Sequence, residues 1–179
     1  MIKYETISSP FFEQNKAFTE SLEKSLKELN ATYSGFCNSY GYEVLATFPR
    51  NALNFQVKFY KNQSTQNGVV IPVNAKDQAG SLFTVSGLNK KSSIHIGKSS
   101  FRRLFTLKEY KSKLPNPYFM NSIASIDKKS IDQLIQVLLD HNISKFKLNH
   151  GVLKIEIHNT TLDPQLLISD IERLIHQWV

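Results

Sequence analysis

The hydrophobic positions near the start of the chain repeat at helical spacing. After Ser9 and Pro10, apolar side chains recur every three or four residues as far as Asn30, as on one side of an amphipathic helix. Serine is a favoured helix cap, and proline fits the first helical turn. The apolar stripe consists of Phe11, Phe18, Leu22, Leu26 and Leu29. We therefore predict a first helix whose stripe covers a core.

Residues 40–96 show the shorter alternation of β-strands. Leu53, Phe55, Val57 and Phe59 alternate with polar residues, which is the period of a strand buried on one side. Short adjacent strands with short breaks favour an antiparallel sheet over β–α–β units. The predicted strands are Tyr42–Phe48, Leu53–Tyr60, Val69–Val73, Ser81–Val85 and Ser93–Ile96.

The last third of the chain predicts a helix, a hairpin and a final helix. Asp127 is a candidate cap for the first of these, and Asn149-His150-Gly151 is a candidate turn between two strands. Asp163-Pro164 pairs a cap with a first-turn proline. We expect one α+β domain over residues 1–179, with a mostly antiparallel sheet packed by N- and C-terminal amphipathic helices and a C-terminal hairpin–helix unit.

The segment Leu114–Val179 also supports a comparison by its order of elements. An Asn-Pro-Tyr-Phe turn at 116–119 precedes a helix, then a strand–turn–strand with a glycine, then an Asp-Pro-capped helix. This order resembles the C-terminal part of an uncharacterised bacterial domain that often follows membrane-spanning helices. The resemblance covers about a third of the chain and implies no catalytic or binding residues. The printed sequence has no comparable membrane helices.

The net charge of +7 is confined to one segment. Residues 90–113 hold eight basic residues against the single acid Glu109, whereas the rest of the chain has 14 basic and 14 acidic residues. The predicted binding residues are Lys90, Lys91, Lys98, Arg102, Arg103, Lys108, Lys111 and Lys113. Such a segment suits an acidic protein surface, a nucleic acid or an anionic membrane surface, unless it is only a solvated face. Our first hypothesis is therefore a non-enzymatic interaction module that contacts an acidic protein partner through residues 90–113.

Gly97-Lys98-Ser99 lies in this segment but does not fit a phosphate-binding loop. That motif requires a glycine five residues before Gly97, where Ser92 stands. We expect instead that a strand ends at Gly97 and that Ser99 or Ser100 caps a helix over 101–111.

In that helix, three apolar residues are predicted to share one face. Phe101, Leu104 and Phe105 would pack on the sheet, while Arg102 and Arg103 would turn their cations outward.

The second hypothesis is a small-molecule-binding or enzymatic domain. The aromatic residues Tyr33, Phe36, Tyr40 and Tyr42 stand among glycines, in what reads as a loop around Cys37, and could line a pocket. The alternative is that they pack the junction of the first helix and the sheet.

The sequence predicts no catalytic residues, no cofactor and no metal site. The five histidines lack ligand spacing, and the acidic residues show no paired arrangement for acid–base work. The N-terminus lacks the apolar core of a signal peptide, and no apolar run is long enough to span a membrane. Because the lone Cys37 also suits a reducing compartment, we expect a cytoplasmic protein.

Overall fold

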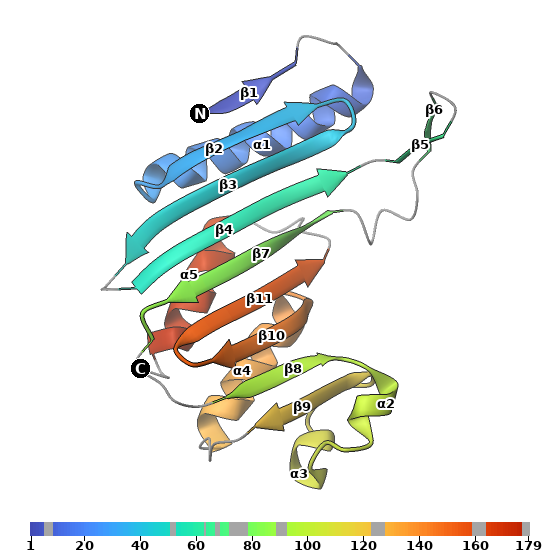
Figure 1. Cartoon of the computed structure of the whole chain (residues 1–179), viewed down its shortest axis with the longest axis vertical. Helices are drawn as coiled ribbons and strands as arrows, with labels where there is room; N and C mark the ends of the chain where they lie inside the picture. The colour runs from blue at the N-terminus through green and yellow to red at the C-terminus, as the bar shows by residue number, and fades with distance from the viewer. Residues whose placement is uncertain are drawn as a thin grey trace.

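A nine-stranded sheet forms the centre of the fold (Figure 1). The computed structural model describes residues 1–5, 9–50, 53–62, 64–66, 69–71, 79–88, 93–122, 128–158 and 164–176. In spatial order the strands are β1 (Ile2–Tyr4), β2 (Thr32–Asn38), β3 (Gly41–Arg50), β4 (Leu53–Asn62), β7 (Ala79–Ser86), β11 (Val152–His158), β10 (Ile143–Asn149), β8 (Ile94–Lys98) and β9 (Tyr118–Ser122). The β1–β2 pair is parallel and every other pair of this sheet is antiparallel. The predicted α+β class with a mostly antiparallel sheet is therefore confirmed.

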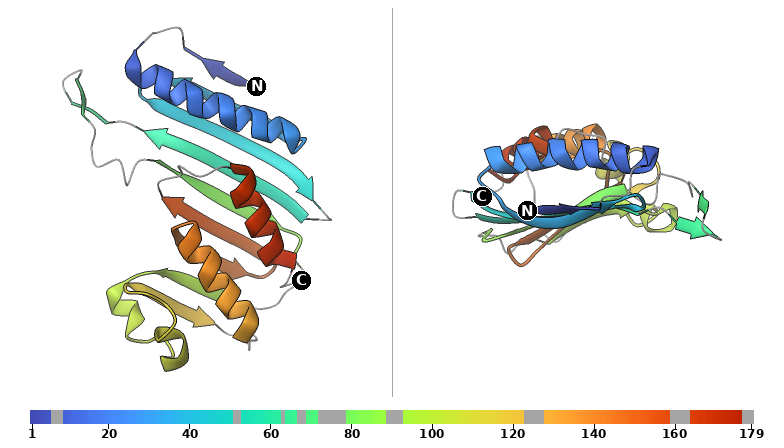
Figure 2. Two further views of the ribbon diagram at one scale, coloured as in Figure 1. Left: turned by 180° about the vertical axis from the view of Figure 1, so that it is seen from behind. Right: turned by 90° about the horizontal axis from the view of Figure 1, so that it is seen from above.

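Three long helices cover one face of the sheet, which leaves the other face without a helical layer in the described part of the chain (Figure 2). They are α1 (Pro10–Glu28), α4 (Lys128–Asp140) and α5 (Pro164–His176). The two four-residue helices α2 (Ser100–Arg103) and α3 (Lys108–Lys111) lie at the β9 end, and β5 (Ser64–Gln66) with β6 (Val69–Ile71) forms a separate hairpin. We call the uncovered side of the sheet the open face.

Alternation along each strand separates the core from the open face. Val57 and Phe83 are fully buried beneath the helices, whereas their neighbours Gln56 and Leu82 are exposed. The same period holds in the C-terminal hairpin, where Ile155 is buried and Lys154 exposed. Since side chains of a strand point alternately to the two faces, the polar positions of these strands form the open face.

Most predicted elements are found where the sequence places them. Ser9 caps α1, because its hydroxyl accepts a hydrogen bond from the Phe12 N–H at 3.1 Å. The predicted hairpin turn holds His150 and Gly151 at positive φ, 47° and 76°. Gly151 is needed there, since a Cβ would stand 2.4 Å from the Leu88 carbonyl oxygen. The proposed caps Asp127 and Asp163 lie outside the described residues.

The loop predicted around Cys37 is wrong. Residues 32–38 form β2, which pairs in register with β3 and, on its other side, with β1. Cys37 points into the core and is fully buried, whereas Phe36 is exposed. The mixture of small and polar residues in this strand hides its period, because only one of its positions is fully buried.

A polar contact joins the two C-terminal helices. His141, which follows α4 directly, places Nε2 2.7 Å from Oδ2 of Asp170 on α5. Asp170 also accepts a hydrogen bond from Arg173 at 2.5 Å. The His141 side chain is 3% exposed, so this contact is made inside the helical layer.

Candidate functional site

The described part of the basic segment, residues 93–113, comprises β8 and most of its connection to β9 at one end of the sheet (Figure 1). Six of the eight predicted binding residues are described, and Lys90 and Lys91 lie outside the described residues. The continuous helix predicted over 101–111 is wrong, because the chain forms α2 and α3 with a turn between them. Ser99 caps α2 as predicted, since its hydroxyl accepts from the Arg102 N–H at 3.3 Å.

Arg103 is engaged with the backbone of its own chain. Its Nη1 donates to the carbonyls of Pro115 and Tyr118 at 3.2 and 2.6 Å, and its Nη2 donates to those of Lys111 and Leu114 at 2.9 and 2.8 Å. A guanidinium has five N–H donors in a fixed fork, which suits such a set of acceptors. The prediction that Arg103 turns outward is therefore wrong. We call this side chain the clamp, because its four hydrogen bonds hold residues 111–118 around the guanidinium.

Thr106 completes the clamp on the edge strand. Its buried hydroxyl accepts a hydrogen bond from the Met120 N–H at 3.1 Å, while Arg103 takes the Tyr118 carbonyl. Both groups belong to β9, the last strand of the sheet. These contacts occupy backbone groups that an exposed edge would offer to another strand.

Two of the predicted lysines also contact side chains of their own chain. Lys113 forms an ion pair with Asp132 of α4. Lys98 donates to Asn142 at 2.9 Å and lies over the Tyr118 ring, with Nζ 5.1 Å from its centroid, yet remains exposed. Exposed contacts of this kind contribute little to stability.

Arg102 lies on the open face, where it stacks on an aromatic ring. Its guanidinium carbon is 5.5 Å from the centroid of Phe119, and the ring of His95 meets Phe119 edge-on. Phe119 crosses β8 at Gly97, where a Cβ would stand 3.0 Å from the ring. Gly97 therefore makes room for Phe119, a role unrelated to phosphate binding. Cation–π stacking holds the Arg102 side chain near the sheet while its donors stay exposed.

Four large apolar side chains of this segment are exposed, and for Phe101, Leu104 and Phe105 this contradicts the prediction that they pack on the sheet. We call them the apolar cluster: Phe101 (71% exposed), Leu104 (66%), Phe105 (70%) and Leu107 (61%). The two phenylalanine rings pack edge-to-face with centroids 5.5 Å apart. The inward positions are taken instead by Thr106 and Leu114, because the clamp turns the chain at 104–107.

A second group of basic side chains lies beside Arg102 on the open face. Lys147 faces Lys154 in the β10–β11 ladder and faces His95 in the β10–β8 ladder. We call His95, Lys147 and Lys154 the basic row. Burial lowers the pKa of His95, and Arg102, Lys147 and Lys145 lower it further by charge repulsion. Sequence reasoning missed this row, because lysines at alternate positions are ordinary on a hairpin with one exposed face. The three residues become neighbours only through the pairing register of β8, β10 and β11.

The aromatic residues of the second hypothesis do not act as a group. Tyr42 is buried and stacks on Phe18 with centroids 4.8 Å apart. The Tyr33 hydroxyl donates to Glu23 of α1 at 2.8 Å. Phe36 and Tyr40 are exposed. Two of the four therefore join α1 to the sheet, and the other two face solvent.

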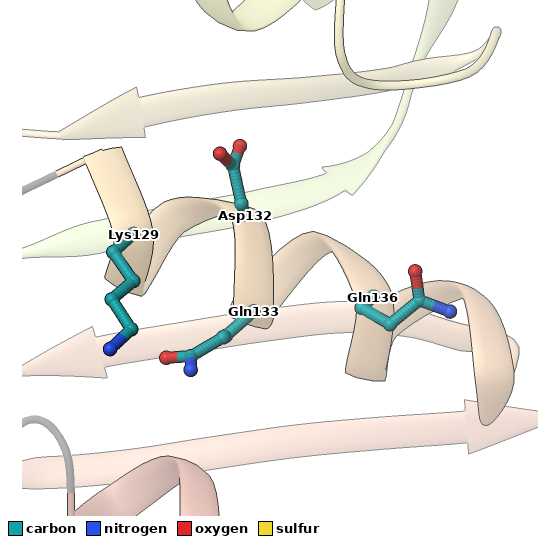
Figure 3. Close-up of a pocket in the computed structure, with 4 residues that line it drawn as sticks. All are labelled: Lys129, Asp132, Gln133 and Gln136. Atoms are coloured by element: carbon teal, nitrogen blue, oxygen red, sulfur yellow. The ribbon is translucent and has the colours of Figure 1, made fainter.

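A hollow is found on the outer side of α4, far along the chain from these aromatics. Lys129, Asp132, Gln133 and Gln136 line it, all from the one helix (Figure 3). Figure 3 shows the Asp132 side chain directed away from those of Lys129 and Gln133. Side chains that diverge from one helix do not converge on a ligand, so we assign no site to it.

The chain matches no family model, no curated protein and no solved structure. Within the described ranges, no helix has the length and apolar character needed to cross a bilayer.

Proposed function

We propose that this chain is a non-enzymatic interaction module that binds an acidic protein partner through residues 98–113. The observation that carries the proposal is the apolar cluster, which lies exposed within a segment whose only acid is Glu109. Large exposed apolar patches are typical of interaction surfaces, and aromatic residues and arginine are enriched in them.

The combination of apolar and basic groups defines the partner. Lys98, Arg102 and Lys108 are exposed in the same segment as the apolar cluster and favour carboxylates. Leu104 and Leu107 gain nothing from a nucleic-acid backbone, but they bury apolar area against an amphipathic protein segment. The guanidinium of Arg102, steadied by Phe119, presents a fork that suits a bidentate carboxylate. An anionic lipid surface is the competing partner, and the experiment separates the two.

The experiment measures fluorescence anisotropy of a labelled peptide of alternating glutamate and leucine. We expect wild-type binding with a Kd on the order of 10 μM, and about tenfold weaker binding for Phe101→Ser/Phe105→Ser and for Arg102→Glu/Lys108→Glu. Lys24→Glu/Lys27→Glu on α1 makes the same charge change on the covered side and is the matched control. Arg103 is left intact in every variant, because it holds the segment together.

Three outcomes contradict the proposal. The first is no binding of the peptide to the wild type, and the second is equal weakening by the control variant. The third is preference for phosphatidylserine vesicles over neutral vesicles, lost in Phe101→Ser/Phe105→Ser, with no peptide binding. That third result assigns the segment to a membrane surface instead.

A further inference from the structure

The basic row is unusual within its own sheet, because its charges are not neutralised. Lys154, Lys147 and His95 are cross-strand neighbours on three adjacent strands, and Thr84 and Asn121 continue the row on either side. Like charges that face each other directly destabilise a sheet. In the described part of the chain, neither Lys147 nor Lys154 forms an ion pair.

Two other lysines on the open face are paired with acids. Lys145 faces Glu156 across β10 and β11, with Nζ and Oε1 2.7 Å apart. Lys58 of β4 pairs with Glu43 of β3 at 2.8 Å. In both pairs an acid on the neighbouring strand neutralises the charge of the lysine. The same hairpin therefore pairs one lysine with an acid and sets the next two against each other.

Arg102 connects the basic row to the apolar cluster. It belongs to α2 between Phe101 and Leu104, yet its guanidinium lies over Phe119 beside His95. The repulsion that lowers the pKa of His95 comes from Arg102 on one side and from Lys147 on the other. The two surfaces thus form one continuous region that turns from the end of the sheet onto its open face.

We infer that the basic row with Arg102 is a second subsite, which takes the carboxylates of an extended acidic stretch in the same protein partner. The inference rests on the proposed function, since the apolar cluster anchors that partner. Strands lie about 4.8 Å apart, and side chains on one side of an extended peptide about 7 Å apart, so flexible lysine stems reach successive carboxylates. Nucleic acid fits the basic row itself less well, because Phe119, the ring beside His95 and Arg102, is buried and does not offer its face for base stacking.

The test compares two labelled peptides on the full chain. One is the glutamate–leucine peptide, and the other carries an additional run of glutamates and glycines at one end. We expect the acidic extension to tighten binding to the wild type about tenfold. Lys147→Gln/Lys154→Gln should abolish that gain and leave the affinity of the shorter peptide unchanged. The matched control is Lys24→Gln/Lys27→Gln, which should keep the gain.

Failure of this inference is distinguishable from failure of the proposed function. The subsite is overturned if the acidic extension still tightens binding to Lys147→Gln/Lys154→Gln, or if the control variant also loses that gain in affinity. Neither result affects the binding of the shorter peptide, on which the proposed function depends. No binding of the shorter peptide overturns both. Preference of the basic row for a single-stranded oligonucleotide over the acidic extension, measured with the same variants, overturns the choice of partner.

Lys154→Glu supplies an independent readout. It places an acid opposite Lys147, as Glu156 stands opposite Lys145, so we expect the melting temperature to rise by about 2 °C. The same variant should lose the gain from the acidic extension. A variant that becomes more stable and keeps the full gain identifies the row as a solvated surface and overturns the inference.

Discussion

Arg102 and Arg103 are adjacent in the chain, but only Arg103 is committed to the backbone. Arg103 donates to four carbonyls between Lys111 and Tyr118, whereas Arg102 stacks on Phe119 and keeps its donors exposed. The two cations that the sequence presents as equivalent therefore have separate roles, one in the fold and one at the surface.

Arg103→Lys should destabilise the protein although it keeps the charge. An ammonium cannot reach four carbonyls at once, so we expect a loss of about 2–3 kcal/mol in the free energy of unfolding. Arg102→Lys should cost less than about 1 kcal/mol, because it weakens only a surface stacking contact. Urea unfolding followed by circular dichroism measures both. Equal losses for the two variants would contradict the clamp.

Thr106→Val should open the edge strand locally. The valine fills the space but leaves the Met120 N–H without its acceptor, which costs about 1–3 kcal/mol. Hydrogen exchange of the Met120 amide should become faster than in the wild type. Thr84→Val on the open face is the control and should leave that amide unchanged. Undiminished protection of Met120 in Thr106→Val would show that another group satisfies it.

The contact between His141 and Asp170 should couple α4 to α5. A double-mutant cycle of His141→Ala and Asp170→Ala isolates this contact from the cavity that each change creates. We expect a coupling free energy of about 1 kcal/mol. Arg173→Ala, on the exposed side of Asp170, should change stability by less than about 0.5 kcal/mol. Strict additivity of the two changes would mean that the helices are held by apolar packing alone.

The lowered pKa of His95 predicts a dependence of stability on pH. Burial, Arg102, Lys147 and Lys145 disfavour the imidazolium in the folded state, and Glu156 opposes them only partly. The unfolded chain therefore binds a proton near pH 6.5 that the folded protein binds only at lower pH. The stabilising contribution is complete above pH 6.5 and falls as the pH decreases towards the folded pKa.

His95→Asn should remove this component of the pH dependence. Urea unfolding of both proteins between about pH 5 and pH 7.5 measures the difference, since the other titrating groups contribute equally to each. If the free energy of unfolding changes with pH in the same way in the wild type and in His95→Asn, this prediction is contradicted. A carboxylate bound beside His95 should raise the pKa of His95 again, because it stabilises the imidazolium. Binding of the extended acidic peptide should therefore strengthen below pH 6.5 in the wild type but not in His95→Asn.

Local patterns predicted most of the fold. The stripe of α1 from Phe18 to Leu29, the alternation of β4 and the glycine turn between β10 and β11 are each specified by neighbouring residues. At the start of α1 the prediction was wrong, because Phe12 is buried and Phe11 is exposed. β2 was missed because its residues are mostly exposed or half-buried, so its hydrophobic period is weak. The helix over 101–111 was wrong because Arg103 and Thr106 bind β9 and the chain leading to it, and these tertiary contacts override a helical pattern.

The candidate site could be predicted only in part. The charge of the segment is visible in the sequence, and it led to Lys98, Arg102 and Lys108. The exposure of Phe101 and Phe105 depends on the turn at 104–107, which the apolar spacing conceals. The place of His95 beside Lys147 in the basic row depends on the register between β8 and β10, which lie about 50 residues apart in the chain. No local pattern contains that information.

The one-sided placement of the long helices has a consequence for how such a protein can diverge. Ile155, Phe146 and Ile96 pack under the helices and are constrained by the core, whereas Lys147 and Lys154 on the open face of the same sheet are exposed. Changes at the latter positions alter recognition and leave folding intact. The sheet can therefore acquire a new specificity by replacing these exposed lysines one at a time, while the residues that pack under the helices stay unchanged.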